Sequence, residues 1–180
     1  MSTASAKGII LRPAIVAFDA LSIIVNQSNG LTGLTQKPLE QIFTGDIADW
    51  SAVGGNPRKI SIYTRNTSSG TYSDWKELAM KKRDYAGSSQ KMAGNEQIAG
   101  EVGNNPNGIS YAGPAYLKDE GIKALPVDGV FPSATNVKNK SFPYLRPTFF
   151  STNGGPSGTA KEFFAFTLSP AGQAIANQVS

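Results

Sequence analysis

The chain has 180 residues, with 17 Lys and Arg against 13 Asp and Glu, and contains neither cysteine nor histidine. The missing residue types exclude disulfides, thiolate metal sites and a Ser-His-Asp hydrolase. The net charge of +4 favours an anionic partner, while the length and the 39% of apolar residues suit one globular domain with a real core. We expect a disordered segment over residues 1–7, which lacks the apolar run of a signal peptide, and one domain over residues 8–180.

The first apolar segment, residues 14–25, predicts a strand pair or one long bent strand that ends in a polar turn. Asp19 interrupts this run and needs a partner if it is buried. Residues 34–39 then open a helix, with Thr35 as its cap, and the helix is expected to end at Gly45.

Trp50 lies in the next loop, where a lone Trp more often packs against a core than forms a ligand platform. The nearby Asp46 and Asp49 suggest an acid and base pair, but this spacing at a helix end is common on solvated surfaces. No nucleophile and base arrangement emerges elsewhere. We therefore expect a protein that is not an enzyme and that uses no cofactor or metal.

Residues 60–75 carry the most informative pattern, which predicts a strand, a tight polar turn and a helix. Apolar residues alternate up to Thr64 and recur at helical spacing from Tyr72 onward. Arg65 therefore stands at the first turn of a helix, where backbone amides lack partners and the helix dipole attracts anions. Gly70 would let an anion approach the backbone closely.

The simpler alternative is that Ser68 or Ser69 caps the helix and that Arg65 pairs with a carboxylate. The density of donors favours an anion site instead, because one guanidinium and several hydroxyls fall within seven positions. The turn lacks the Lys and the Gly spacing of a nucleotide P-loop, so an ATPase is excluded.

A compact basic run, residues 81–83, is expected at the end of the same helix, where cations complement the helix dipole. No aromatic residues are interleaved with this run to form a stacking platform for bases. A solvated surface is therefore favoured over a nucleic-acid interface.

The rest of the chain predicts short elements separated by polar turns. Tyr111, in one of the predicted strands, suits either the rim of a ligand cleft or the core. Ser157-Gly158-Thr159 repeats the Ser-Gly-Thr signature, but no Arg precedes it, so we expect a turn and a cap there. The predicted elements are a helix over 95–102, strands over 109–113 and 122–127, a loop over 128–140, an extended run over 145–150, a helix over 159–168 and a short last helix begun by Ser169 and Pro170.

Four segments together resemble the phosphate-binding proteins that serve phosphate ABC transporters. The match rests on residues 17–26, residues 39–50, Arg65 with Ser69-Gly70-Thr71, and the ending over residues 158–173. The resemblance implies an α/β fold, a single lobe of the type II periplasmic-binding-protein kind, with a mixed central sheet flanked by helices. Family members have two lobes that close on phosphate, and this chain resembles the second lobe plus the C-terminal segment, with the first lobe missing.

The resemblance also implies the site. Arg65, Ser69, Gly70 and Thr71 match the phosphate contacts of the second lobe, and Thr67 stands where many members have an Asp. The phosphate-binding residues expected here are Arg65, Thr67, Ser68, Ser69, Gly70 and Thr71. The run over 145–150 is expected to be the return crossing between lobes and to pair near residues 14–25.

Two functions follow from these expectations. The first is a solute-binding module that captures inorganic phosphate or a similar tetrahedral oxyanion, with an ABC transporter permease and a missing first lobe or a second copy as partners. The second is a truncated binding-protein fold that acts as an interaction, signalling or assembly unit with a vestigial anion site. The resemblance implies a periplasmic or extracellular location, although the chain itself leaves a cytoplasmic one open, and no nucleic acid or membrane insertion is expected.

Overall fold

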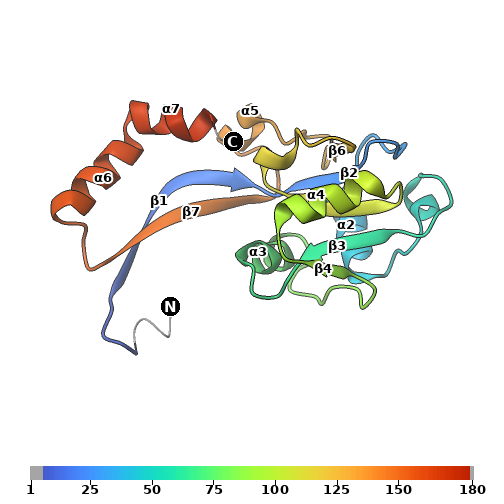
Figure 1. The fold of residues 1–180 in the computed structure, drawn as a ribbon, viewed down its shortest axis with the longest axis horizontal. Helices are drawn as coiled ribbons and strands as arrows, with labels where there is room; N and C mark the ends of the chain where they lie inside the picture. The colour runs from blue at the N-terminus through green and yellow to red at the C-terminus, as the bar shows by residue number, and fades with distance from the viewer. Residues whose placement is uncertain (1–5, 179–180) are drawn as a thin grey trace. The chain divides into compact units, whose positions relative to one another are not determined.

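The computed structural model describes residues 6–178, so most of the expected N-terminal segment, residues 1–5, lies outside the described residues. The chain divides into two compact units (Figure 1). Unit 2 is residues 20–145, and unit 1 combines residues 1–19 with residues 146–180.

Unit 2 is built on a five-stranded mixed sheet with the strand order β4-β3-β5-β2-β6. β3 pairs in parallel with both β4 and β5, whereas β2 pairs antiparallel with β5 and β6. Its elements are β2 (Ser22–Asn26), α2 (Gln36–Thr44), η1 (Trp50–Val53), β3 (Ser61–Arg65), α3 (Gly70–Leu78), β4 (Gln90–Met92), α4 (Asn95–Asn104), β5 (Gly108–Ala112), η2 (Pro114–Tyr116), β6 (Ile122–Leu125) and α5 (Ala134–Lys138).

Helices cover both faces of this sheet because its inner strand β2 is buried on both sides. Every residue of β2 is buried, and alternate residues point to opposite faces. Ile24 packs with Ile98 and Val102 of α4, while Ile23 belongs to the larger core that includes α2 and α3. Figure 1 accordingly shows α4 on the near face of the sheet and α2 on the far face.

Aromatic packing fixes α3 against the sheet. The fully buried Trp75 stacks on Tyr111 of β5, with ring centroids 4.7 Å apart and planes inclined by 14°. Phe43 of α2 and Tyr144 meet the same indole edge-on, at 5.0 and 4.8 Å. Trp75 is therefore the anchor of α3, and Tyr111 is a core residue rather than a residue on the rim of a cleft.

Unit 1 contains a two-stranded sheet of β1 (Leu11–Ala20) and β7 (Leu145–Asn153), followed by α6 (Gly158–Leu168) and α7 (Pro170–Gln178). The predicted pairing of the two extended runs is thus confirmed. Asp19 also has the partner that its position requires, because Arg146 donates to one of its carboxylate oxygens from Nε at 3.0 Å and from Nη2 at 2.7 Å.

Most predicted elements are confirmed, with boundaries shifted by a few residues. The long N-terminal run is two strands, since the chain breaks at Leu21 between β1 and β2. The start of α7 also follows the prediction, because the Ser169 hydroxyl accepts a hydrogen bond from the Gly172 amide at 3.2 Å. Thr35 precedes α2 but makes no capping bond; the Gln36 amide instead donates to the carboxylate of Asp128 at 3.2 Å.

Two expectations about the middle of the chain were wrong, and one strand was not predicted. The predicted loop 128–140 contains the short helix α5, because the hydroxyl of Ser133 accepts from the Asn136 amide and so caps a turn. The strand β4 was missed, since it is only three residues long and polar. Finally, α3 ends at Leu78, so the basic run 81–83 follows the helix instead of closing it.

The basic run is held by carboxylates. Lys81 lies 3.0 Å from the buried carboxylate of Glu40 and Arg83 lies 3.2 Å from it, and Arg83 also forms a bidentate pair with Asp46 at 2.8 and 2.9 Å. Lys82 pairs with Glu77 at 3.1 Å. Because Lys81 and Arg83 donate to Glu40, they lower the pKa of its carboxyl from 4.5 to about 2.

We expect Glu40→Gln to reduce stability at neutral pH and to weaken the acid dependence of folding. The folded pKa of Glu40 lies below its unfolded value, so its contribution is complete above pH 4.5 and is lost as the pH falls through about 2. The measurement is the free energy of unfolding in urea at several pH values. The control is Glu101→Gln, which removes an exposed carboxylate on α4; equal pH dependence of the two variants would contradict this role for Glu40.

Candidate functional site

The turn after β3 lies at the edge of the sheet where its parallel strands end. β3 and β5 run in the same direction, so Arg65 and Ala112 mark the same carboxyl edge. Ligands of α/β sheets bind at this edge, where loops leave the strands and helices begin. The predicted anion turn, residues 65–71, therefore occupies the position that the fold favours for a site.

Backbone bonds fix the shape of the turn. The Asn66 amide donates to the Met92 carbonyl of the neighbouring β4 at 3.0 Å, which extends the β3 pairing by one step. The Asn66 carbonyl then accepts from the Ser69 amide at 3.1 Å, and its side-chain oxygen accepts from the Ser68 hydroxyl at 2.9 Å. Asn66 is thus the residue that closes the turn, and the sequence did not single it out for this role.

The first turn of α3 is open. Ser69 has the backbone conformation of an N-cap, but its hydroxyl makes no capping hydrogen bond. Within residues 6–178, no acceptor contacts the backbone amides of Gly70 and Tyr72. Gly70 is exposed, and a Cβ built on it would have no heavy atom within 4 Å. The helix start therefore presents amides to open space, which is the arrangement that receives an anion.

Arg65 is half-buried beside this turn, and its guanidinium is held by a neutral group. Nη1 donates to the side-chain oxygen of Asn95 at 2.7 Å. Nε is buried and has no hydrogen-bond partner among the residues that the structure describes. In the same part of the chain no carboxylate forms an ion pair with Arg65, so its charge is not neutralised there.

The six predicted site residues occupy one turn but differ in accessibility. Thr67, Ser68 and Gly70 are exposed, Ser69 and Arg65 are half-buried, and Thr71 is buried. The Ser68 hydroxyl already donates its proton to the side-chain oxygen of Asn66, so it would have to break this hydrogen bond to donate to an anion. The sequence missed Asn95, because its nearness to Arg65 depends on the undetected strand β4.

A chain of buried hydroxyls lies beneath the turn. The Tyr85 hydroxyl lies 3.0 Å from the Tyr72 carbonyl, to which it donates, and 2.8 Å from the Tyr111 hydroxyl. Burial raises the pKa of Tyr85 and of Tyr111, so both remain protonated at physiological pH. These phenols contribute hydrogen bonds to the support of α3.

The two carboxylates considered for acid and base chemistry, Asp46 and Asp49, are both engaged in structural hydrogen bonds. Arg83 lowers the pKa of Asp46, while Asp49 caps η1 by accepting from the amide and hydroxyl of Ser51 at 2.9 and 2.6 Å, which lowers its pKa. Both are therefore ionised and paired. The second Ser-Gly-Thr sequence is not a separate turn: Gly158 and Thr159 begin α6, and Ser157 holds the N-cap position without a capping hydrogen bond, contrary to expectation.

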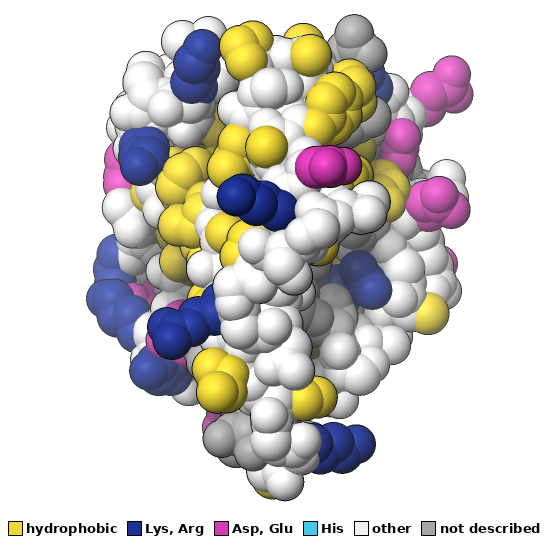
Figure 2. Space-filling model, turned by 90° about the vertical axis from the view of Figure 1, so that its left-hand side faces the viewer, with side chains coloured by type: hydrophobic (Ala, Val, Ile, Leu, Met, Phe, Trp, Pro, Cys, Tyr) yellow, Lys and Arg dark blue, Asp and Glu magenta, His cyan; other side chains and the backbone are white. Residues whose placement is uncertain are grey.

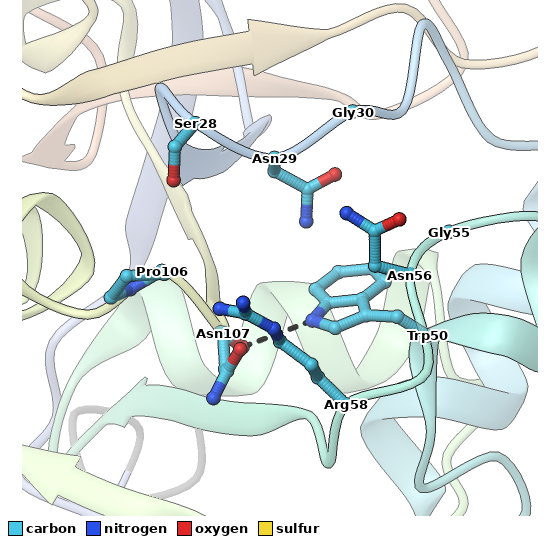
Figure 3. A pocket seen from close by; sticks show the side chains of 9 residues that line it. All are labelled: Ser28, Asn29, Gly30, Trp50, Gly55, Asn56, Arg58, Pro106 and Asn107. Atoms are coloured by element: carbon cyan, nitrogen blue, oxygen red, sulfur yellow. Dashed lines mark hydrogen bonds between the residues drawn. The ribbon is translucent and has the colours of Figure 1, made fainter.

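A hollow lies at the opposite end of the sheet from the anion turn (Figure 3). It has a volume of about 170 Å³ and is lined by loop residues that include Asn29, Trp50, Asn56 and Arg58. Figure 3 shows the amides of Asn29 and Asn56 pointing toward one another across it. Ligand pockets usually enclose about 300–1,000 Å³. The hollow is smaller than that, and it is separated from the anion turn by the length of β3.

Comparisons with known proteins place this chain in a family. The profile of the PBP superfamily domain matches residues 2–171, so the chain belongs to the PBP superfamily. Its fold is that of a periplasmic binding protein of the phosphate-binding kind.

Named relatives are phosphate-binding proteins. The phosphate-binding protein PstS of Bacillus subtilis is 31% identical over 86% of this chain and 51% of its own length. A solved structure of a putative phosphate ABC transporter substrate-binding protein with bound phosphate, from Clostridium perfringens, has a TM-score of 0.85 and 30% identity over 99% of this chain and 73% of that one. An ABC-type phosphate transport receptor from Vibrio cholerae has a TM-score of 0.84 and 28% identity, over 94% of this chain and 71% of that one.

These matches leave part of each relative without a counterpart. The chain spans about half the length of the Bacillus subtilis relative, and the solved structures extend beyond it by more than a quarter of their residues. The relatives are binding proteins and receptors rather than enzymes. Over the described residues, none of the helices has the length and apolar composition that crossing a bilayer requires.

We expect Ser69→Ala to cost little stability, because the hydroxyl that it removes makes no capping bond in the folded chain. The matched control is Ser133→Ala, which removes a hydroxyl that does cap a helix. Removing an engaged cap costs about 0.5–2 kcal/mol, whereas Ser69→Ala should stay below about 0.5 kcal/mol. Urea unfolding of the two variants checks this, and an equal cost would mean that Ser69 acts as a structural cap.

Proposed function

We propose that this chain captures inorganic phosphate or a similar tetrahedral oxyanion at the turn over residues 65–71. The observations that carry the proposal are the open start of α3 and, at the beginning of the same turn, an Arg65 guanidinium that no described carboxylate neutralises. An anion placed there would receive the amides of the helix start and the positive end of its dipole. Capture of this kind forms and breaks no covalent bond.

The residues of the turn have separate roles in this proposal. Arg65 supplies charge and planar donors, and its unpartnered Nε is one of them. Ser69 and Thr71 supply hydroxyls, and Thr67 and Ser68 border the exposed side. Gly70 leaves room for the anion at the helix start, since a side chain there would occupy the open space in front of the amides.

The relatives support phosphate as the ligand, and one of them holds phosphate in its solved structure. A closed cleft normally surrounds its ligand on most sides, so this single turn should hold phosphate weakly unless a further lobe contributes. We propose that a further lobe closes over the turn, and a second copy of this chain is one way to supply it. By the same kinship, an ABC transporter permease is the downstream partner and the periplasm or cell exterior is the location.

We expect phosphate to give a saturable heat in titration calorimetry, and Arg65→Ala to weaken the affinity by about tenfold or more through loss of charge-assisted hydrogen bonds. Gly70→Ala should leave the fold intact, because its methyl meets no atom, but should weaken binding by crowding the helix start. Rising salt should lower the affinity of the unaltered protein.

The matched control is Arg58→Ala, which removes the same charge at the opposite end of β3. It should leave the phosphate affinity within about twofold, since a separation of this size is largely screened by salt. Absence of saturable heat, or an equal loss in both Arg variants, would contradict the site.

A second candidate function is favoured by the surface of unit 1. Several large apolar side chains of this unit are 37% to 64% exposed, and such exposure suits an interaction surface where the side chains lie together (Figure 2). Figure 2 shows hydrophobic side chains gathered in patches on one side of the molecule, with charged side chains between and around them. An assembly unit would use exposed apolar side chains of unit 1, which are Ile10, Leu11, Ile15, Phe18, Phe149, Phe163, Phe166, Leu168 and Ile175.

For this candidate we expect a mass above that of one chain in light scattering after gel filtration, because burying exposed apolar side chains of unit 1 between two copies removes them from water. Phe166→Ser should shift the protein toward the monomer. Phe131→Ser, which alters a similarly exposed Phe in unit 2, should not. A monomer at every concentration would contradict self-assembly through unit 1.

A further inference from the structure

We propose that Asn95 is a positioning residue for Arg65, and that its neutral amide keeps the guanidinium available to an anion. The inference rests on the proposed function, since it assigns a role at the same turn. Asn95 accepts from Nη1 of Arg65 at 2.7 Å, which is the one side-chain hydrogen bond that holds this guanidinium among the residues described.

The sheet brings the two residues together. β4 runs parallel to β3, with Met92 opposite Arg65, and the chain passes through only two residues before α4 begins at Asn95. The Asn66 amide donates to the Met92 carbonyl, so the hydrogen bonds between β3 and β4 continue into the anion turn on one side and lead to the start of α4 on the other. The distance between the guanidinium and Asn95 is therefore set by backbone pairing and not by a flexible loop.

The helix behind Asn95 is firmly anchored. Ile98, Ala99 and Val102 of α4 are buried against β2 and β3, with Ile24 and Tyr63 in the same cluster. An anchored helix places its first residue reproducibly, so Asn95 restricts the rotamers of a long and otherwise mobile side chain. Holding Arg65 before the ligand arrives reduces the entropy lost on binding.

The chemical type of the partner matters as much as its position. A carboxylate in this place would orient Arg65 equally well, but it would cancel the guanidinium charge and repel an incoming anion. An amide oxygen accepts the same hydrogen bond and leaves the charge in place. Asn95 therefore acts on affinity through the charge balance of the turn, in addition to the geometry of Arg65.

The test compares Asn95→Asp with Gln97→Glu by phosphate calorimetry. Both add one negative charge to the first turn of α4, where it suits the helix dipole, but Gln97 is exposed and its side-chain oxygen accepts from the Ala93 amide. We expect Asn95→Asp to weaken phosphate binding about tenfold or more and Gln97→Glu to change it less than about threefold. Asn95→Ala should weaken it by several-fold through the loss of orientation alone.

Double variants separate positioning from a general structural effect. In the Arg65→Ala background, Asn95→Ala and Asn95→Asp should cause no further loss of phosphate affinity, because the group they act through is gone. Loss that persists in that background, or unchanged binding in Asn95→Asp alone, would overturn the proposal.

A second readout works even if the chain does not bind phosphate. The carboxyl introduced by Asn95→Asp should titrate about one pKa unit or more below an ordinary Asp in NMR, because it contacts the guanidinium. That depression should disappear when Arg65→Ala is added. A carboxyl with an ordinary pKa in both backgrounds would show that the contact is absent, which overturns the inference independently of the proposed function.

Discussion

The stacking of Trp75 on Tyr111 is the contact on which the open helix start depends. α3 has nine residues, and a helix of this length is not stable in water by itself, so tertiary packing must hold it. Trp75 provides that packing, because it is fully buried between Tyr111, Phe43 and Tyr144. The amides of Gly70 and Tyr72 can remain without protein partners because burial at the middle of the helix compensates for the unsatisfied end.

Net positive charge alone does not define the anion turn. Several cations whose partners are seen form structural cross-links with carboxylates: Lys81 and Arg83 gather around Glu40 of α2, and Arg146 of β7 holds Asp19 of β1. Arg65 differs because its seen partner is an amide. A pair with a carboxylate would make Arg65 another structural cross-link, so the charge of the turn depends on which residue receives the guanidinium.

The sequence predicted the parts of the fold that depend on local chemistry. Strong periodicity located α3 and α6, and the glycine after α2 adopts the left-handed conformation, φ 85°, that ends a helix. The strand β4 could not be found, because three polar residues carry no periodic signal and become a strand only through pairing with β3. The helix α5 was missed for a related reason, since a five-residue helix depends on its cap more than on hydrophobic spacing.

The anion turn was predictable as a motif, but its supporting contacts were not. Arg65, the hydroxyls and Gly70 are contiguous in sequence, so their type and order were visible at once. Asn66 and Asn95 act through β4, and a long-range pairing of that kind leaves no mark in a single sequence. The sequence could not predict whether the Ser69 hydroxyl caps α3, because a serine before a helix looks the same in sequence whether or not its hydroxyl makes the capping hydrogen bond.

The two units differ in how far each can account for its own stability. Unit 2 has an apolar core on each face of its sheet, so the anion turn is folded by contacts within residues 20–145. In the described part of unit 1, α6 buries none of its residues, and a two-stranded sheet is at best marginally stable in water. Unit 1 can therefore be buried against a partner independently of whether unit 2 binds an anion. An assembly role for unit 1 does not require the anion site of unit 2 to be vestigial.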